Sequence, residues 1–218
     1  NLNETPKAIL LWRAMLQWLG GIGIIVMAIT LMPIMNIGGM QLFVISNTHT
    51  PEKILPKSKE ISIRLIVIYS SLTLVCAFFY KIFGMSFFDS IVHSMTTIAT
   101  GGFSNYNESI GYFDSGFIEL TATIFIILGS VPFIAYIKYL GGDKKIFISD
   151  TQIKTFIKIL IFSIFIIFVY LSVKNQSIFE INFREVSFNV VSILTGTGYV
   201  TNDFSKWGQF PLVYFLIL

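Results

Sequence analysis

Two short loops of glycine and threonine, each followed by an aromatic residue, are the segments of this sequence best suited to chemistry. They consist of Thr100, Gly101, Gly102 and Phe103, and of Gly196, Thr197, Gly198 and Tyr199. Glycine adopts backbone angles that side chains forbid, so successive carbonyl oxygens can turn toward one axis. A ring of carbonyls can replace the hydration shell of a monovalent cation. Neither loop contains the carboxylates that a divalent-cation site would use. We predict a cation filter here, with the aromatic residue packed behind each loop.

Each loop follows an apolar segment that is too short to cross a membrane. Phe87–Ala99 and Phe183–Leu194 offer about a dozen residues, whereas a helix rising about 1.5 Å per residue needs about 20 to cross the hydrocarbon core. We predict that both are re-entrant half-helices whose C-terminal ends, with about half a negative charge, point at the loops. Irregular backbone at this depth must be buried in protein or line a water-filled cavity, so the loops should face a pore.

The half-helices and their loops repeat at an offset of 96 residues. The aligned pairs are Asp89 and Glu185, Thr96 and Ser192, Ile98 and Leu194, Gly102 and Gly198, and Phe103 and Tyr199. Such a repeat predicts a pseudo-symmetric arrangement of similar units. The expected fold is therefore an all-α polytopic membrane protein. Its units of membrane helix, pore half-helix, filter loop and membrane helix would surround a central cation pore.

Composition supports a membrane protein and excludes the secreted, nucleic-acid-binding and cytosolic classes. Of the 218 residues 54% are hydrophobic and 12% charged, and the mean hydropathy is +0.76. An ordinary soluble domain carries about 25% charged residues. The apolar runs predict spans at Ile9–Pro33, Ile61–Phe83, Phe113–Leu140 with a kink near Gly129 and Pro132, Phe156–Val173, and a last one that begins near Trp207.

These spans divide the chain into five parts. We expect a closing membrane helix of a first repeat at 1–35, a cytoplasmic loop at 36–60, a complete second repeat at 61–140 with its filter at 99–104, a second cytoplasmic loop at 141–153, and a third repeat at 154–218 with its filter at 195–199. Because the sequence starts without Met and stops inside an apolar run, we expect it to be a fragment of a longer chain.

Charge predicts the orientation of these parts. The side that holds Asn36–Arg64 and Lys138–Lys158 carries nine basic and four acidic residues, a net charge of +5, and the other side carries −2. Basic loops stay in the cytoplasm, so the half-helices should enter from outside. The outer acidic residues would concentrate cations near the mouth of the pore.

The other candidate residues do not suggest an enzyme. The single cysteine, Cys76, lies inside an apolar run, so no disulfide or cysteine metal cluster is expected. We interpret His93 as a packing or hydrogen-bonding residue, because the aligned residue is Asn189. The sequence contains no Walker loop, dinucleotide fingerprint or nucleophile–base pair, and we expect no cofactor.

Five segments together resemble the TrkH branch of the Trk/Ktr/HKT potassium-transporter superfamily. They are Leu16–Val26, Gly38–Leu42, His93–Ser104, Gly129–Phe133 and Leu194–Tyr199. The resemblance implies four repeats around one potassium pathway, with one filter glycine in each. Gly102 and Gly198 match these glycines, and the matching carbonyl positions that would coordinate potassium are Thr100, Gly101, Gly196 and Thr197.

The resemblance also implies the setting in which such a chain works. Family members are multi-pass proteins of the bacterial inner membrane, surrounded by lipid, and form a homodimer on a cytoplasmic nucleotide-binding regulatory ring, a TrkA-like subunit. Potassium is the transported substrate, and no nucleic acid is involved. Two alternatives remain open at this point: a sodium-coupled or sodium-permeable relative, and a non-conducting truncated remnant.

Overall fold

A computed structural model describes residues 1–35, 54–174 and 183–217. Within these residues every regular element is a helix, which confirms the predicted all-helical fold. The α-helices are α1 (Lys7–Met35), α3 (Ile54–Ile82), α4 (Phe87–Ile98), α5 (Gly116–Ser130), α6 (Phe133–Leu140), α7 (Ile146–Ser149), α8 (Thr151–Lys174), α9 (Phe183–Leu194) and α10 (Gln209–Ile217). Short 3-10 turns, η1 (Leu2–Glu4), η3 (Ser109–Phe113) and η5 (Phe204–Trp207), lie between them.

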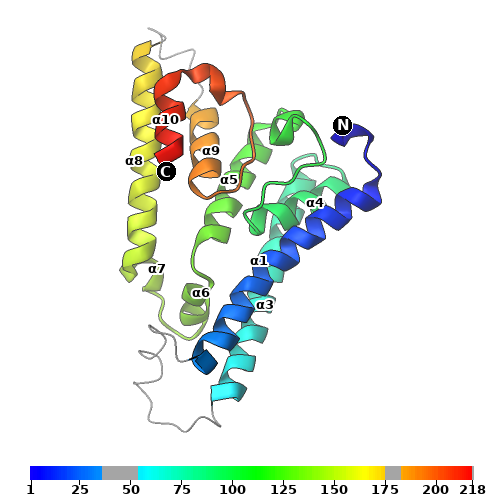
Figure 1. Cartoon of the computed structure of the whole chain (residues 1–218), viewed down its shortest axis with the longest axis vertical. Coiled ribbons are helices and arrows are strands. Elements are labelled where there is room, and N and C mark those ends of the chain that lie inside the picture. The colour runs from blue at the N-terminus through cyan, green and yellow to red at the C-terminus, as the bar shows by residue number, and fades with distance from the viewer. Residues whose placement is uncertain (36–53, 175–182, 218) are drawn as a thin grey trace.

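Three helices are long and apolar enough to cross a membrane. Within the described residues the candidate spans are Lys7–Met27, Glu60–Ile82 and Thr151–Lys174, and most of each is not buried by the rest of the chain. Apolar side chains that face outward along such helices suit contact with lipid. In Figure 1 these helices are the long rods, whereas α4 and α9 are short and lie against them.

The half-helices enter the molecule from one end. Figure 1 shows that α9 starts at the upper end, runs inward, and is followed by a loop that returns to that end. The end of α1, the start of α3, and the segment from α6 to the start of α8 lie at the opposite, lower end. The helix ends that flank the two basic segments therefore lie together at one end of the described structure.

The third expected span is broken rather than kinked. The axes of α5 and α6 differ by 82° across a break at Val131 and Pro132. Proline removes a backbone donor and pushes the preceding residue out of the helical region. Val131 accordingly has the extended angles φ −70° and ψ 137°.

Helix boundaries differ from the hydropathy pattern at the lower end. α3 begins at Ile54, inside the segment 36–60 that was expected to be a loop, and α7 and the first turn of α8 occupy part of the segment 141–153. Hydropathy marks where the membrane ends, but a polar sequence can continue a helix beyond it. The rest of the expected first loop, including Gly38–Leu42, lies outside the described residues.

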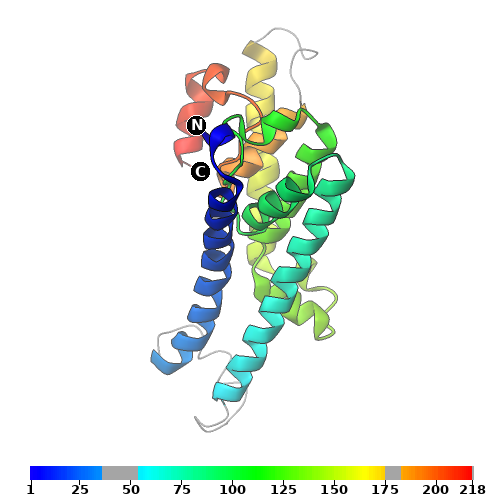
Figure 2. The same ribbon diagram turned by 90° about the vertical axis from the view of Figure 1, so that its right-hand side faces the viewer.

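The half-helix α4 is enclosed by protein. Figure 2 shows it between α1 and α3, with α5 behind. Its buried side chains are largely polar, among them Ser90, His93, Thr96 and Thr97. Polar groups in a membrane protein need partners, so this composition suits a helix shielded from lipid. Cys76 of α3 is buried in the same core.

Candidate functional site

The two predicted loops share one pattern of positive φ angles. φ is positive at the first and third position of each, with +47° at Thr100, +71° at Gly102, +71° at Gly196 and +83° at Gly198. The second positions, Gly101 and Thr197, are not among the residues with positive φ. Only glycine adopts this region without steric cost, so the aligned glycines are required by the shape of the loop.

The hydrogen bonds that fix this conformation also repeat at the offset of 96. The amide of Gly102 donates to the carbonyl of Thr96 at 3.4 Å, and the amide of Gly198 donates to that of Ser192 at 3.2 Å. The hydroxyls of Thr96 and Ser192 donate in turn to the carbonyl of the aromatic residue that ends each loop, at 2.9 and 2.7 Å. Both half-helices therefore end in the same way.

The two loops also lie against each other. A Cβ atom built on Gly102 would collide with the carbonyl oxygen of Thr197 and approach the backbone of Gly198. The chain thus brings the two glycine loops, 96 residues apart in sequence, into direct backbone contact. The Thr197 carbonyl therefore lies directly against Gly102.

Tyr199 ties the later loop to the earlier half-helix. Its side chain is fully buried, and its hydroxyl oxygen lies 2.5 Å from the hydroxyl oxygen of Thr96 and 3.2 Å from the carbonyl oxygen of His93. The adjacent hydroxyl of Thr97 lies 2.8 Å from that of Tyr80 on α3. A buried chain of hydroxyl groups therefore joins α3 and α4 to Tyr199 of the later loop.

Phe103 does not occupy the equivalent place. Its side chain is 40% exposed, and the guanidinium carbon of Arg13 lies 4.6 Å from the centre of its ring. The prediction that an aromatic residue packs behind its loop holds for Tyr199, whose hydroxyl contacts α4. Within the described residues Phe103 instead lies beside Arg13 of α1.

Sequence reasoning missed Gln17 on α1. Its side-chain amide donates to the carbonyl of Gly101 at 2.6 Å, and its side-chain oxygen accepts from the amide of Phe103 at 3.4 Å. Gln17 lies in the segment Leu16–Val26, but its position in the sequence does not indicate contact with a loop 84 residues away. Only the tertiary packing of α1 reveals the contact.

His93 is a structural residue, as predicted. It is fully buried, with Nδ1 at 2.8 Å from the carbonyl of Asp89 and Nε2 at 3.0 Å from the hydroxyl of Ser104. The aligned Asn189 donates to the carbonyl of Glu185 at 2.8 Å. Both side chains therefore hold the first turn of their half-helix.

The Asp89 carboxylate anchors the segment that follows the first loop. It accepts from the side-chain amide of Asn105 at 2.7 Å and from the hydroxyl of Tyr106 at 3.1 Å. Burial, and then the neighbouring Asp89 charge, raise the pKa of the Tyr106 phenol. Tyr106 therefore stays a neutral hydrogen-bond donor.

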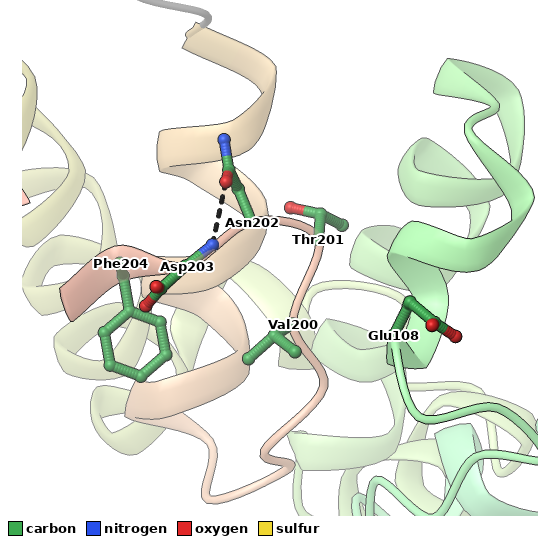
Figure 3. A pocket seen from close by; sticks show the side chains of 6 residues that line it. All are labelled: Glu108, Val200, Thr201, Asn202, Asp203 and Phe204. Carbon is green, nitrogen blue, oxygen red and sulfur yellow. Dashed lines mark hydrogen bonds between the residues drawn. The ribbon is translucent and has the colours of Figure 1, made fainter. Parts of the chain in front are cut away.

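A hollow of about 430 Å³ lies beside the later loop. Figure 3 shows the side chains that line it: Glu108, Val200, Thr201, Asn202, Asp203 and Phe204. The hydroxyl and amide of Ser205 donate to the Asp203 carboxylate and lower its pKa, so it is ionised at neutral pH. Two acidic side chains thus border a hollow directly after Tyr199.

An ion pair joins α5 to α9. The carboxylate of Glu119 is 5% exposed and lies 2.8 Å from Nε of Arg184, which is 43% exposed. A Cβ atom on Gly116 would collide with the Arg184 guanidinium, so the glycine provides space for it. Within the described residues, no group of three histidine, cysteine or acidic side chains is placed to hold a metal ion.

Comparison with known proteins places this geometry in a family context. A model of the TrkH family, described as a cation transport protein, matches residues 1–218. The chain is 35% identical over 219 residues to the Trk system potassium uptake protein TrkI of Halomonas elongata, and 38% identical over 222 residues to the TrkH protein of Vibrio parahaemolyticus. The alignments cover 100% and 99% of this chain, but 44% and 46% of these relatives.

A solved structure shows the same fold. The crystal structure of the potassium transporter TrkH from Vibrio parahaemolyticus matches with a TM-score of 0.83 and 35% identity. The match covers 100% of this chain and 44% of that chain. The sequence thus spans less than half the length of the relatives it matches.

Proposed function

The chain belongs to the TrkH family of cation transport proteins, and from this premise we propose that it forms part of the pore of a potassium uptake protein. The family is one of membrane transport proteins and not of enzymes. The relatives named above are potassium uptake proteins. Potassium is accordingly the proposed substrate of the complete protein.

The observation that carries this proposal is the pair of matching loops in contact. Both have positive φ at the first and third position, and both follow the C-terminus of a half-helix. The proposed ligands are the backbone carbonyls of Thr100, Gly101, Gly196 and Thr197, next to the filter glycines Gly102 and Gly198. Carbonyl dipoles can replace the water around a monovalent cation, and the half-helix termini add negative potential.

The structure also supports a path toward these carbonyls. The hollow bordered by Glu108 and Asp203 lies next to the later loop. Ionised side chains at a pore mouth raise the local concentration of cations, and salt weakens this effect. We propose that this is the outer mouth.

The assembly is proposed by analogy with the family resemblance. The complete protein would be a homodimer in the bacterial inner membrane, associated with a TrkA-like cytoplasmic nucleotide-binding subunit. The segments 1–35, 61–140 and 154–218 would contribute to three successive repeats around the pathway. Further repeats would come from the remainder of a longer chain.

Rubidium uptake tests the proposal. A bacterial strain without its own potassium uptake systems would express the complete reading frame that contains this sequence, together with the regulatory subunit, with the 218-residue chain alone as control. We expect the complete protein to restore growth at low potassium and to take up rubidium, and the control to do neither. Sodium uptake in place of rubidium, or no uptake despite verified membrane insertion, would contradict potassium transport.

A further inference from the structure

The side chain of Gln17 holds the first loop from the neighbouring helix α1. Its amide group donates to the carbonyl of Gly101, while its oxygen accepts from the amide of Phe103. One carboxamide therefore bridges the two peptide groups on either side of Gly102. A side chain that bonds two groups of one loop restricts the rotation of the peptides between them.

The space around Gly101 fits this arrangement. A Cβ atom on Gly101 would collide with the side chain of Gln17, and the three nearest atoms to it all belong to Gln17. In the later loop the aligned residue is Thr197, whose hydroxyl lies 2.7 Å from that of Thr195. Gln17 therefore occupies the space that the loop's own side chain would fill at the aligned position, and supplies the polar contacts from another helix.

Gln17 lies on a part of α1 that is hydrogen-bonded to α3. The indole of the next residue, Trp18, donates to the hydroxyl of Thr73 at 3.0 Å, and the Trp18 carbonyl accepts from the hydroxyl of Tyr69 at 3.0 Å. One turn along α1, Gly21 allows close approach, since a Cβ atom there would lie 2.9 Å from the hydroxyl oxygen of Tyr69 and 3.5 Å from the Cβ atom of Ala99. Contacts to α3 and to the start of the loop thus flank Gln17 on the helix.

We propose that Gln17 is a positioning residue of the first loop, which sets the orientation of the Gly101 carbonyl and so the preference of the pore for potassium over sodium. A carbonyl oxygen has two lone pairs, so the Gly101 oxygen can accept from Gln17 and still face a cation. The donated proton fixes where the second lone pair points. This inference rests on the proposed function of the loops.

The first test removes the hydrogen bonds and keeps the volume. In the complete protein, with membrane abundance measured, Gln17→Met is compared with Gln152→Leu, which makes a similar polar-to-apolar change at an exposed site on α8. Because the contribution of a hydrogen bond is modest, we expect Gln17→Met to lower the ratio of rubidium to sodium uptake about 2- to 10-fold. It should also raise the KM for rubidium more than it lowers the maximal rate. Gln152→Leu should match the wild type.

The second test uses the collision at Gly101. Gly101→Thr should abolish most uptake because its side chain meets Gln17, and Gly101→Thr combined with Gln17→Ala should recover it at least in part. Non-additivity of this kind reports direct contact. This double-variant test also decides whether Gln17 positions the loop if the Gln17→Met protein does not reach the membrane.

The outcomes separate the inference from the proposed function. Absence of rubidium uptake by the wild-type protein contradicts the function itself. Rubidium uptake by the wild type with an unchanged ion ratio in Gln17→Met overturns the role of Gln17. Where Gln17→Met is absent from the membrane, failure of Gln17→Ala to recover Gly101→Thr overturns it instead.

Discussion

Replacing the two aligned glycines should weaken ion selection by different amounts. Gly198 has φ +83°, and no atom lies within 4 Å of a Cβ built on it, so Gly198→Ser adds backbone strain without collision. Gly102 has φ +71°, and its Cβ would also collide with the Thr197 carbonyl. Gly102→Ser therefore has to move the neighbouring loop as well.

The magnitude follows from the cost of a side chain in this region of φ. Left-handed backbone costs about 1–2 kcal/mol for a residue other than glycine. If the loop relieves that strain by turning its carbonyls, ion coordination loses up to the same energy, a factor of about 5 to 30. We expect Gly198→Ser to lower the rubidium-to-sodium uptake ratio within this range, and Gly102→Ser to lower it further.

A glycine outside the loops provides the control. Gly84 has φ +111° and also has open space around its Cβ position, so Gly84→Ser adds strain away from the filter. It should lower thermal stability in detergent without changing the ion ratio. An unchanged ratio in both loop variants, or an equal loss in Gly84→Ser, would contradict a role of the loop glycines in ion selection.

Three further outcomes are expected. Tyr199→Phe removes a buried hydroxyl that contacts Thr96, so it should lower the free energy of unfolding by about 1 kcal/mol and increase sodium uptake. A melting temperature and a rubidium-to-sodium ratio equal to wild type would contradict this. Arg184→Met leaves the buried Glu119 carboxylate without its ion pair and should destabilise the protein by about 1–3 kcal/mol. Glu119→Gln should cost less, because Arg184 is half exposed and reaches water. The reverse order in thermal unfolding would be inconsistent with the burial of Glu119. Asp203→Asn should reduce rubidium uptake at low ionic strength and have little effect at high salt, because salt screens the attraction of cations by an exposed charge. An effect independent of salt would exclude a role of Asp203 in concentrating cations.

Much of the fold follows from local rules that the sequence displays. The predicted half-helix Phe183–Leu194 has the bounds of α9, and Phe87–Ala99 ends one residue beyond α4. The length of each apolar segment and the glycines that follow it are sufficient to predict both half-helices. A kink near Pro132 was expected, since proline acts on its own backbone neighbours, and the structure has a full break there. Its angle of 82° was not, because that angle depends on what α6 packs against.

The backbone of the candidate site could be predicted from the sequence, but the side chains that contact the loops could not. Glycine positions predict the two loops, because positive φ is a property of a single residue. Tyr199 and Phe103 align, yet one is buried behind α4 and the other is partly exposed beside Arg13. Gln17 is distant in sequence from the loop that it contacts. Such differences arise from tertiary packing, which the local pattern does not contain.

Direct location of the ion tests the central claim most closely. Crystals of the complete protein grown with rubidium or thallium in place of potassium would reveal the ion by its anomalous scattering. We expect a peak between the two loops, coordinated by backbone oxygens of Thr100, Gly101, Gly196 and Thr197. A pathway occupied elsewhere, with no peak at these carbonyls in a protein that transports rubidium, would contradict it.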